Sequence, residues 1–438
     1  MTTMKNQPTT MKTRLCFLNV QPHCLLVGQP GGFATAEDFH RFAAECGFTG
    51  ITMPTGFVDI DQAISSSSYR DDFQANLIGC GLTDGLVRME MHVDGQNVCV
   101  APYRVKRTGH FVSPDFATTN VANMEGLAKD NLFKAIDASA AFGFKYLPGF
   151  CGGRGFAAAM AKWPAWPKHL PAWVMGLLAL KWQPILEYAA DRGVTITFEF
   201  GHPENDLLTG ANFVLFYSML SDKAKLGVGI NADASHFLNI GINPMPHLDK
   251  AAETGCKFTN HFKWGASVDR GDGTASTYGG WTNWSQSSTT FFTFATVGPD
   301  WLAREFYEFL LAMTRKQGDE CFDVVYEGED ATIINPKQAM QIGAANCRAA
   351  ITGDRFIKLN GVVDEEDFVM TTPMEVNDVA LYFPGGRLLE LESWAGGPFD
   401  QAFDSPLKPY DLLEMDCHEV TACRQLLADT GHEAEAEA

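Results

Sequence analysis

Four stretches of the chain place carboxylate or imidazole side chains directly after an apolar run. They are VTITFEFGHPEN (194–205), GVGINADASHF (227–237), FTNHFKW (258–264) and VVYEGED (324–330). Each apolar run has the β-branched and aromatic residues of a buried strand, so its polar group lies at the strand's C-terminal end. The groups of interest are Glu199, Asp233, His236, His261, Lys263 and Glu327. Any one alone could be a structural ion pair or a hydrogen-bonded histidine.

Together these groups predict a metal centre. Carboxylates and an imidazole that converge on one point are unfavourable unless a cation lies between them. Such a set, with open positions, suits a divalent ion such as Mn²⁺, Mg²⁺ or Co²⁺. Zinc is possible, although no cysteine lies at these strand ends. We therefore expect one divalent ion, with Mn²⁺ favoured, on Glu199, Asp233, His261 and Glu327.

The predicted strands and helices that would position these groups alternate along the chain from residue 14 onward. The predicted strands are residues 15–20, 50–54, 86–93, 144–150, 194–199, 227–233, 257–263 and 322–327. The predicted helices are residues 35–46, 124–142, 171–192, 211–225, 245–254, 299–316 and 336–352. This alternation predicts an α/β fold, a (β/α)8 TIM barrel in which the C-terminal strand ends converge on one face. A doubly wound sheet is the alternative, but no glycine-rich phosphate loop follows an early strand.

The barrel pattern stops near residue 355. We expect residues 1–13 to be a disordered leader, 14–355 to form the catalytic barrel, and 356–438 to be a C-terminal extension. That extension, with strands predicted at 379–383 and 388–391 and a helix at 420–429, would pack on the barrel or on a neighbouring subunit. Two aromatic insertions, 152–182 and 271–298, follow predicted strands. They could form a lid or wall for a sugar ring, or serve local packing or subunit contact.

Composition limits the partners. The 438 residues carry a net charge of −20, with a pI near 4.9, which disfavours nucleic acid and anionic lipid surfaces. Eleven cysteines occur without a CxxC pair, a pattern typical of a reduced compartment. No apolar run is long enough to predict a membrane span, and the N-terminus has no apolar core of a secretion signal. We therefore expect a cytoplasmic protein, assembled as a homo-oligomer, that acts on a small molecule.

The four polar stretches resemble an ordered family signature. FEFGHPEN, NADASHF, NHFK and YEGED are similar to the motifs of the xylose isomerase-like TIM-barrel superfamily of sugar isomerases and epimerases. The resemblance covers about residues 14–352 and is strongest over 194–335. This chain departs from the family pattern by Gly201, inserted before His202-Pro203, and by Trp264, where many relatives carry an aspartate.

The resemblance implies roles for individual residues. The Glu, Asp, His, Glu set of the family binds one divalent metal, and its two glutamates, here Glu199 and Glu327, also transfer protons. The reaction it implies is keto-sugar isomerisation or epimerisation, in which a proton leaves the carbon next to a carbonyl and a metal-bound enediolate forms. The residues expected to contact the carbohydrate substrate are His236, Lys263, Arg270, His202 and His92. Lys263 could instead pair with a carboxylate.

Three other functions compete with this interpretation. A lyase could use the same proton abstraction, either as an inosose or keto-sugar dehydratase or to cleave a C-glycoside. A DNA-repair endonuclease on the same barrel would need a basic groove, which the charge of −20 disfavours. A metal-free sugar-binding barrel would show no bound divalent ion on metal analysis.

Overall fold

A computed structural model describes most of the barrel and the end of the chain. The described residues are 12–18, 33–100, 120–155, 169–201, 205–233, 236–237, 244–261, 321–327, the helical positions 337, 340, 341, 344, 345, 347 and 348, and 408–437. The predicted helix 299–316, the insertion 271–298 and the predicted strands 379–383 and 388–391 lie outside them. Within the described residues, no helix is long and apolar enough to cross a membrane.

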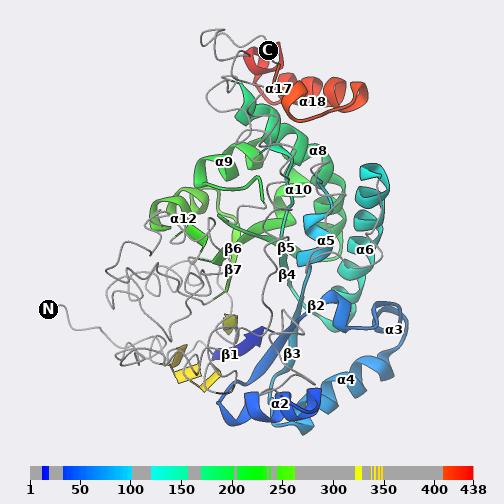
Figure 1. The fold of residues 1–438 in the computed structure, drawn as a ribbon, viewed down its shortest axis with the longest axis vertical. Coiled ribbons are helices and arrows are strands. Elements are labelled where there is room, and N and C mark those ends of the chain that lie inside the picture. Colours follow the sequence, from blue (N-terminus) through cyan, green and yellow to red (C-terminus); the bar gives the residue numbers. More distant parts are fainter. Residues whose placement is uncertain are drawn as a thin grey trace, which may run out of the picture.

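Eight parallel strands form the centre of the molecule (Figure 1). They are β1 (Lys12–Leu18), β2 (Gly50–Pro54), β3 (Gly85–Glu90), β4 (Tyr146–Gly149), β5 (Thr195–Glu199), β6 (Val228–Asp233), β7 (Lys257–His261) and β8 (Cys321–Glu327). Each overlaps a strand predicted from the sequence. The hydrogen-bonded orders are β3-β2-β1-β8 and β4-β5-β6-β7, the neighbour order of a (β/α)8 barrel. The predicted fold class is therefore confirmed.

The two four-stranded sheets meet at both of their edges, where β3 lies beside β4 and β7 beside β8. At the first seam the Met91 amide donates to the Pro148 carbonyl at 2.7 Å. At the second, the Asn260 side chain donates to the Asp323 carbonyl (2.6 Å) and accepts from the Val325 amide (3.2 Å). A side-chain amide thus links strands β7 and β8, which satisfies backbone groups that would otherwise be buried without partners.

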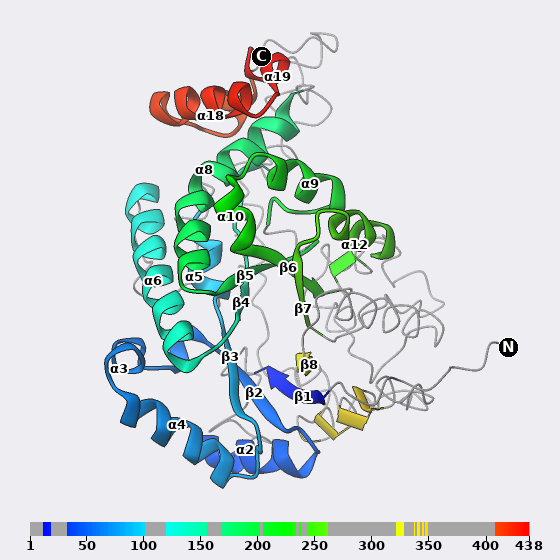
Figure 2. The ribbon, with the colours of Figure 1, turned by 180° about the vertical axis from the view of Figure 1, so that it is seen from behind.

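Helices cover the outside of the strands (Figures 1 and 2). They include α2 (Ala36–Glu45), α3 (Ile60–Ser65), α4 (Ser67–Gly79), α5 (His92–Gln96), α6 (Val121–Phe142), α8 (Leu170–Asp191), α9 (Gly210–Ser218), α10 (Asp222–Leu226) and α12 (Met245–Ala252). Thr35 caps α2 in a reciprocal capping box with Asp38, as its sequence position predicts. The helix predicted at 211–225 was wrong in its continuity, because these residues form two helices. Ser221 is the N-cap of α10, because its hydroxyl accepts from the Ala224 amide at 3.1 Å, and a new helix therefore begins there.

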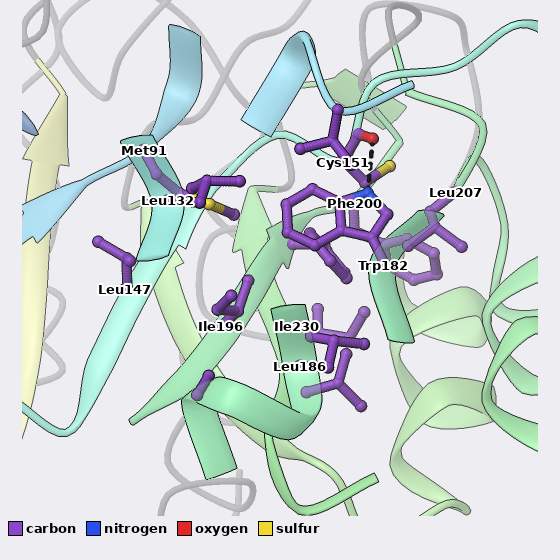
Figure 3. Close-up of a cluster of buried hydrophobic side chains, with 14 of the residues drawn as sticks. Met91, Leu132, Leu147, Cys151, Trp182, Leu186, Ile196, Phe200, Leu207 and Ile230 are labelled. Carbon is purple, nitrogen blue, oxygen red and sulfur yellow. Dashed lines mark hydrogen bonds between the residues drawn. The ribbon is translucent and has the colours of Figure 1, made fainter. Parts of the chain in front are cut away.

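In β5 and β6 the strand alternation separates apolar side chains from polar ones, whereas Cys16, Leu18, Val87 and Val325 form a smaller apolar cluster of their own. Outward side chains of β4, β5 and β6 pack against the helix layer, and Figure 3 shows Trp182 and Leu186 of α8 close to Ile196 and Ile230. Trp182 also donates to the Cys151 carbonyl at 2.9 Å. Trp173 and Trp182, from the aromatic insertion 152–182, are both fully buried in α8. These two tryptophans therefore serve local packing, whereas Trp163 and Trp166 lie outside the described residues.

The end of the chain packs on α8. Helices α17 (Pro409–Leu412), α18 (Cys417–Asp429) and α19 (Glu433–Ala436) lie beside it in both views (Figures 1 and 2). The Trp173 indole donates to the Glu435 carbonyl at 2.7 Å. Gly176 allows the close approach, because a Cβ there would lie 2.7 Å from the Cys423 sulfur. Oligomeric state and cellular compartment remain predictions.

Candidate metal centre

Four side chains gather at the C-terminal strand ends. Glu199 ends β5, Asp233 ends β6, His261 ends β7 and Glu327 ends β8. All four are buried, with at most 4 % of each residue exposed. One potential ligand atom from each lies within 4.8 Å of the others. Residues from positions 199 to 327 are thus brought to the single point where the sequence predicts a divalent ion.

The geometry of His261 fits such an ion. Its Nδ1 lies 3.6 Å from the Glu199 carboxylate and 3.5 Å from that of Glu327. Both ring nitrogens are buried, and neither has a hydrogen-bond partner among the described residues. Buried polar atoms are ordinarily satisfied, and a ligand bound at Nδ1 would satisfy this one. Three carboxylates and one imidazole nitrogen are donors suited to Mn²⁺ or Mg²⁺.

Two further histidines contact Glu199. His236 Nε2 lies 2.5 Å from Glu199 Oε1 and 3.1 Å from Asp233 Oδ2, while His92 Nε2 lies 3.1 Å from Glu199 Oε2. Burial would raise the pKa of Glu199. The charge of His261 and hydrogen bonds from the histidines outweigh burial and hold that pKa well below its usual range. Glu199 is therefore a carboxylate near neutral pH.

The same balance acts in the opposite direction on His261. Burial would lower its pKa, but the nearby carboxylates, Glu199 foremost and Glu90 and Glu327 after it, raise it well above its usual value. In this state the imidazole carries positive charge among the carboxylates. A divalent ion at this point could supply that positive charge instead and leave the ring neutral for ligation.

The residues after β5 hold Glu199 in place. The Asn205 side chain donates to the Glu199 carbonyl at 3.0 Å and accepts from the amides of Cys151 and Gly152, both at 3.1 Å. This amide ties the end of β5 to the loop after β4. Gly201 has φ +83, and a Cβ there would lie 2.7 Å from the Phe237 ring. The inserted glycine is thus required by a left-handed turn beneath a packed aromatic ring.

A polar layer supports the centre from inside the barrel. Thr197 and Thr259 share a hydroxyl contact of 2.7 Å, and Thr259 donates to the Asn231 side chain at 2.8 Å. Each residue lies two positions before a proposed ligand on its own strand, so its side chain shares the inward face. This network fixes the three strands β5, β6 and β7 relative to one another below Glu199, Asp233 and His261.

Sequence reasoning missed Glu90, at the end of β3. Its side chain is completely buried, and its Oε2 lies 3.6 Å from His261 Nε2. Arg88, two residues earlier, approaches Glu90 Oε1 to 3.6 Å. A signal was present in LVRMEMHV: Arg88, Glu90 and His92 alternate with Val87, Met89 and Met91, which places the polar set on one face.

The structure accounts for only part of the expected substrate contacts. His236 and His92 lie beside Glu199, although His92 opens helix α5 rather than ending a strand as predicted. The predicted strand 86–93 ends three residues early, at Glu90. His202, Lys263 and Arg270 lie outside the described residues, so their roles remain predictions.

Fold and site together give an α/β barrel with a buried carboxylate and imidazole cluster that could hold a metal ion. Searches of family models and of curated proteins find no match to the chain. Similar solved structures include a xylose isomerase domain protein from Planctomyces limnophilus, with 14% identity over 79% of this chain and 97% of that one and a TM-score of 0.46.

Two other similar structures have named activities. An L-ribulose 3-epimerase is 14% identical over 88% of this chain and 100% of its own, with a TM-score of 0.42. A probable 3-DHS dehydratase from Bacillus anthracis is 13% identical over 76% of this chain and 97% of its own, with a TM-score of 0.44. At these values the likenesses carry no argument about this chain's reaction, which has to come from the site.

Proposed function

We propose that this protein is a divalent-metal-dependent isomerase or epimerase of keto-sugars. The observation that carries the proposal is the buried set of Glu199, Asp233, His261 and Glu327, whose ligand atoms lie within 4.8 Å of one another. Burying three carboxylates and an imidazole together costs free energy unless a cation lies among them. Mn²⁺ is the favoured ion, with Mg²⁺, Co²⁺ and Zn²⁺ as alternatives.

The proposed chemistry divides between the ion and the protein. When bound, a divalent cation polarises a substrate carbonyl and makes the hydrogen on the neighbouring carbon more acidic. Glu199 and Glu327 would then act as the pair that moves this proton, one removing it and the other returning it. The two carboxylates come from β5 and β8, so they approach the centre from different strands.

Two histidines are proposed to contact substrate oxygens. His236 and His92 both reach Glu199, at 2.5 and 3.1 Å, and both are buried. An N–H that now donates to Glu199 is positioned to donate to a sugar hydroxyl when substrate enters. His202, Lys263 and Arg270 complete the proposed contacts.

The test begins with metal analysis of the purified protein. We expect about one divalent ion per chain, loss of activity after chelation, and recovery on adding Mn²⁺. The assay should follow deuterium exchange from D₂O into keto-sugars, because exchange next to the carbonyl reports proton abstraction whatever the product. A protein that binds no divalent ion and exchanges no hydrogen would overturn the proposal.

A lyase uses the same proton abstraction and differs in the fate of the resulting carbanion. If a β-hydroxyl or an aglycone leaves, the product is an enone or a released aglycone rather than an epimer. Incubation with inososes and 3-keto-glycosides, followed at the enone absorbance, separates the two outcomes. Growth of that absorbance without epimer formation would replace the isomerase by a dehydratase or deglycosidase on the same site.

A further inference from the structure

A line of alternating charges runs through the barrel interior to the metal centre. Its members, in order, are Arg14 (β1), Asp323 (β8), Arg88 (β3), Glu90 (β3) and His261 (β7). The Arg14 guanidinium donates to Asp323 at 2.8 Å, and Arg88 Nη1 lies 3.6 Å from the same carboxylate. Side-chain exposure falls from 27% at Arg14 to zero at Glu90 and His261. The line therefore leads from the barrel's other end to the buried centre.

The contact between Glu90 and His261 involves the ring nitrogen that does not face Glu199 and Glu327. Nδ1 faces Glu199 and Glu327, whereas Nε2 faces Glu90 Oε2 at 3.6 Å. Among the described residues, Glu90 is the carboxylate that faces Nε2. An imidazole that ligates through one nitrogen commonly donates from the other to a carboxylate, which fixes the ring's tautomer and orientation.

A local irregularity of the sheet sets this arrangement. The β2–β3 register shifts between Ile51 and Thr52, so that Ile51 pairs with Leu86 but Thr52 pairs with Arg88. Val87 is the extra residue. Bulges of this kind re-aim side chains beside functional sites. Here the bulge sets the register from Arg88 onward, so that Arg88 and Glu90 lie opposite Thr52 and Pro54 with their side chains buried.

Glu90, His92 and His261 could in principle form a second metal site, since their ligand atoms also lie within 4.8 Å. The charge balance argues against a second ion. Arg88, itself 3% exposed, already places a permanent positive charge 3.6 Å from Glu90 Oε1. A second divalent cation would have to bind beside that guanidinium in a buried setting.

We propose that Glu90 is a positioning residue: held by Arg88, it orients the His261 ring so that Nδ1 is presented to Glu199 and Glu327. The inference rests on the proposed function, because it assigns His261 as a metal ligand. It adds a residue that contacts neither metal nor substrate in the proposed scheme.

The test measures Mn²⁺ binding to chelator-treated protein by calorimetry. Glu90→Gln keeps the shape and removes the charge, and we expect about tenfold weaker binding. Replacing both partners, in Arg88→Met/Glu90→Leu, avoids a lone buried charge and so protects folding. We expect this double variant to lose up to about 100-fold in affinity and to change the Mn²⁺ electron paramagnetic resonance spectrum. Glu90→Asp, which retains the charge, should recover part of the loss.

Asp94→Asn is the matched control. Asp94 is also a buried carboxylate near β3, but it accepts from Thr55 and Asn131, both at 2.9 Å, away from His261. We expect this variant to lower the melting temperature without changing Mn²⁺ affinity.

Three outcomes would decide against the inference. If Glu90→Gln and the double variant both bind Mn²⁺ within twofold of the wild type, Glu90 does not position His261. If the wild type binds two Mn²⁺ and the double variant one, Glu90 belongs to a second cation site. If the wild type binds none, the proposed function itself fails, and this is visible before any variant is made.

Discussion

Two buried ionic groups in this molecule are built in opposite ways. The four-residue ion cluster of Glu125, Arg154, Lys181 and Glu419 joins α6, the loop after β4, α8 and α18. Its two cations and two carboxylates alternate in a ring whose four contacts are 2.5 to 2.8 Å. The metal centre has more carboxylates than cations, and the contacts of His261 to its carboxylates are 3.5 to 3.6 Å.

The difference separates an ion cluster that is complete by itself from a cluster that could accept a metal ion. In the ion cluster every charge already has a partner at hydrogen-bond distance, so nothing further is needed to make burial favourable. At the metal centre, His261 Nδ1 is buried without a hydrogen bond among the described residues, with carboxylates of Glu199 and Glu327 3.6 and 3.5 Å away. A buried group whose polar atoms lack close partners is where a ligand is expected.

The largest expected effect comes from removing a carboxylate of the metal centre. Glu199→Gln and Glu327→Gln should each lower turnover by more than 100-fold, because general acid–base catalysis contributes about 10²–10⁴. Circular dichroism should show an unchanged fold. The matched control is Glu187→Gln on α8, which accepts from Ser221 at 2.6 Å far from the centre and should leave turnover unchanged. Retention of more than about a tenth of the wild-type rate, a loss under ~1.4 kcal/mol, would contradict the assignment.

Metal removal should lower the stability of the protein through the metal centre and not through the ion cluster. Chelation should lower the melting temperature, and Mn²⁺ at about 100 times its dissociation constant should restore about 2.7 kcal/mol. Differential scanning calorimetry with and without Mn²⁺ measures this. Glu419→Gln, in the ion cluster, should show the same Mn²⁺-dependent gain as the wild type. A gain that vanished in Glu419→Gln would show that the two groups are coupled.

Breaking the ion cluster should cost stability rather than catalysis. Glu419→Gln leaves Arg154 and Lys181 with one carboxylate fewer, and we expect a loss of about 1–2 kcal/mol, because the group is only partly buried. Urea unfolding provides the measurement. Glu433→Gln, on the exposed first turn of α19, is the control and should change stability by less than about 0.5 kcal/mol. Equal losses in the two variants would mean that the cluster contributes nothing.

The smallest effect is a dependence of stability on acid pH. Burial would raise the pKa of Glu419, but hydrogen bonds from Arg154 and Lys181 lower it to about 2. Because the folded-state pKa lies below the unfolded value, this contribution is fully present above about pH 4.5 and is lost as pH falls toward 2. Urea midpoints between pH 5 and pH 2 should therefore converge for wild type and Glu419→Gln. A constant difference across that range would exclude this linkage.

Much of the barrel could be predicted from local sequence. Period-two apolar runs located all eight strands, because one face of each strand must pack against the helix layer whatever the neighbours are. Four of these runs carry Glu199, Asp233, His261 and Glu327 at or near their C-terminal ends, and parallel strands bring such ends to one face. The convergence of these four side chains could therefore be predicted from the sequence.

Tertiary structure decided the features that depend on partners distant in sequence. The bulge at Val87, the Asn260 side chain that bridges β7 and β8, and the approach of Glu90 to His261 each need two strands in one register. His92 meets Glu199 across 107 positions, and no local pattern encodes that contact. Burial and periodicity act on each segment alone, whereas register, seams and charge pairing arise only when the strands close into a barrel. For that reason the sequence by itself determined the strands and the carboxylates that end them, and the closed barrel decided how those groups are oriented and which side chains they contact.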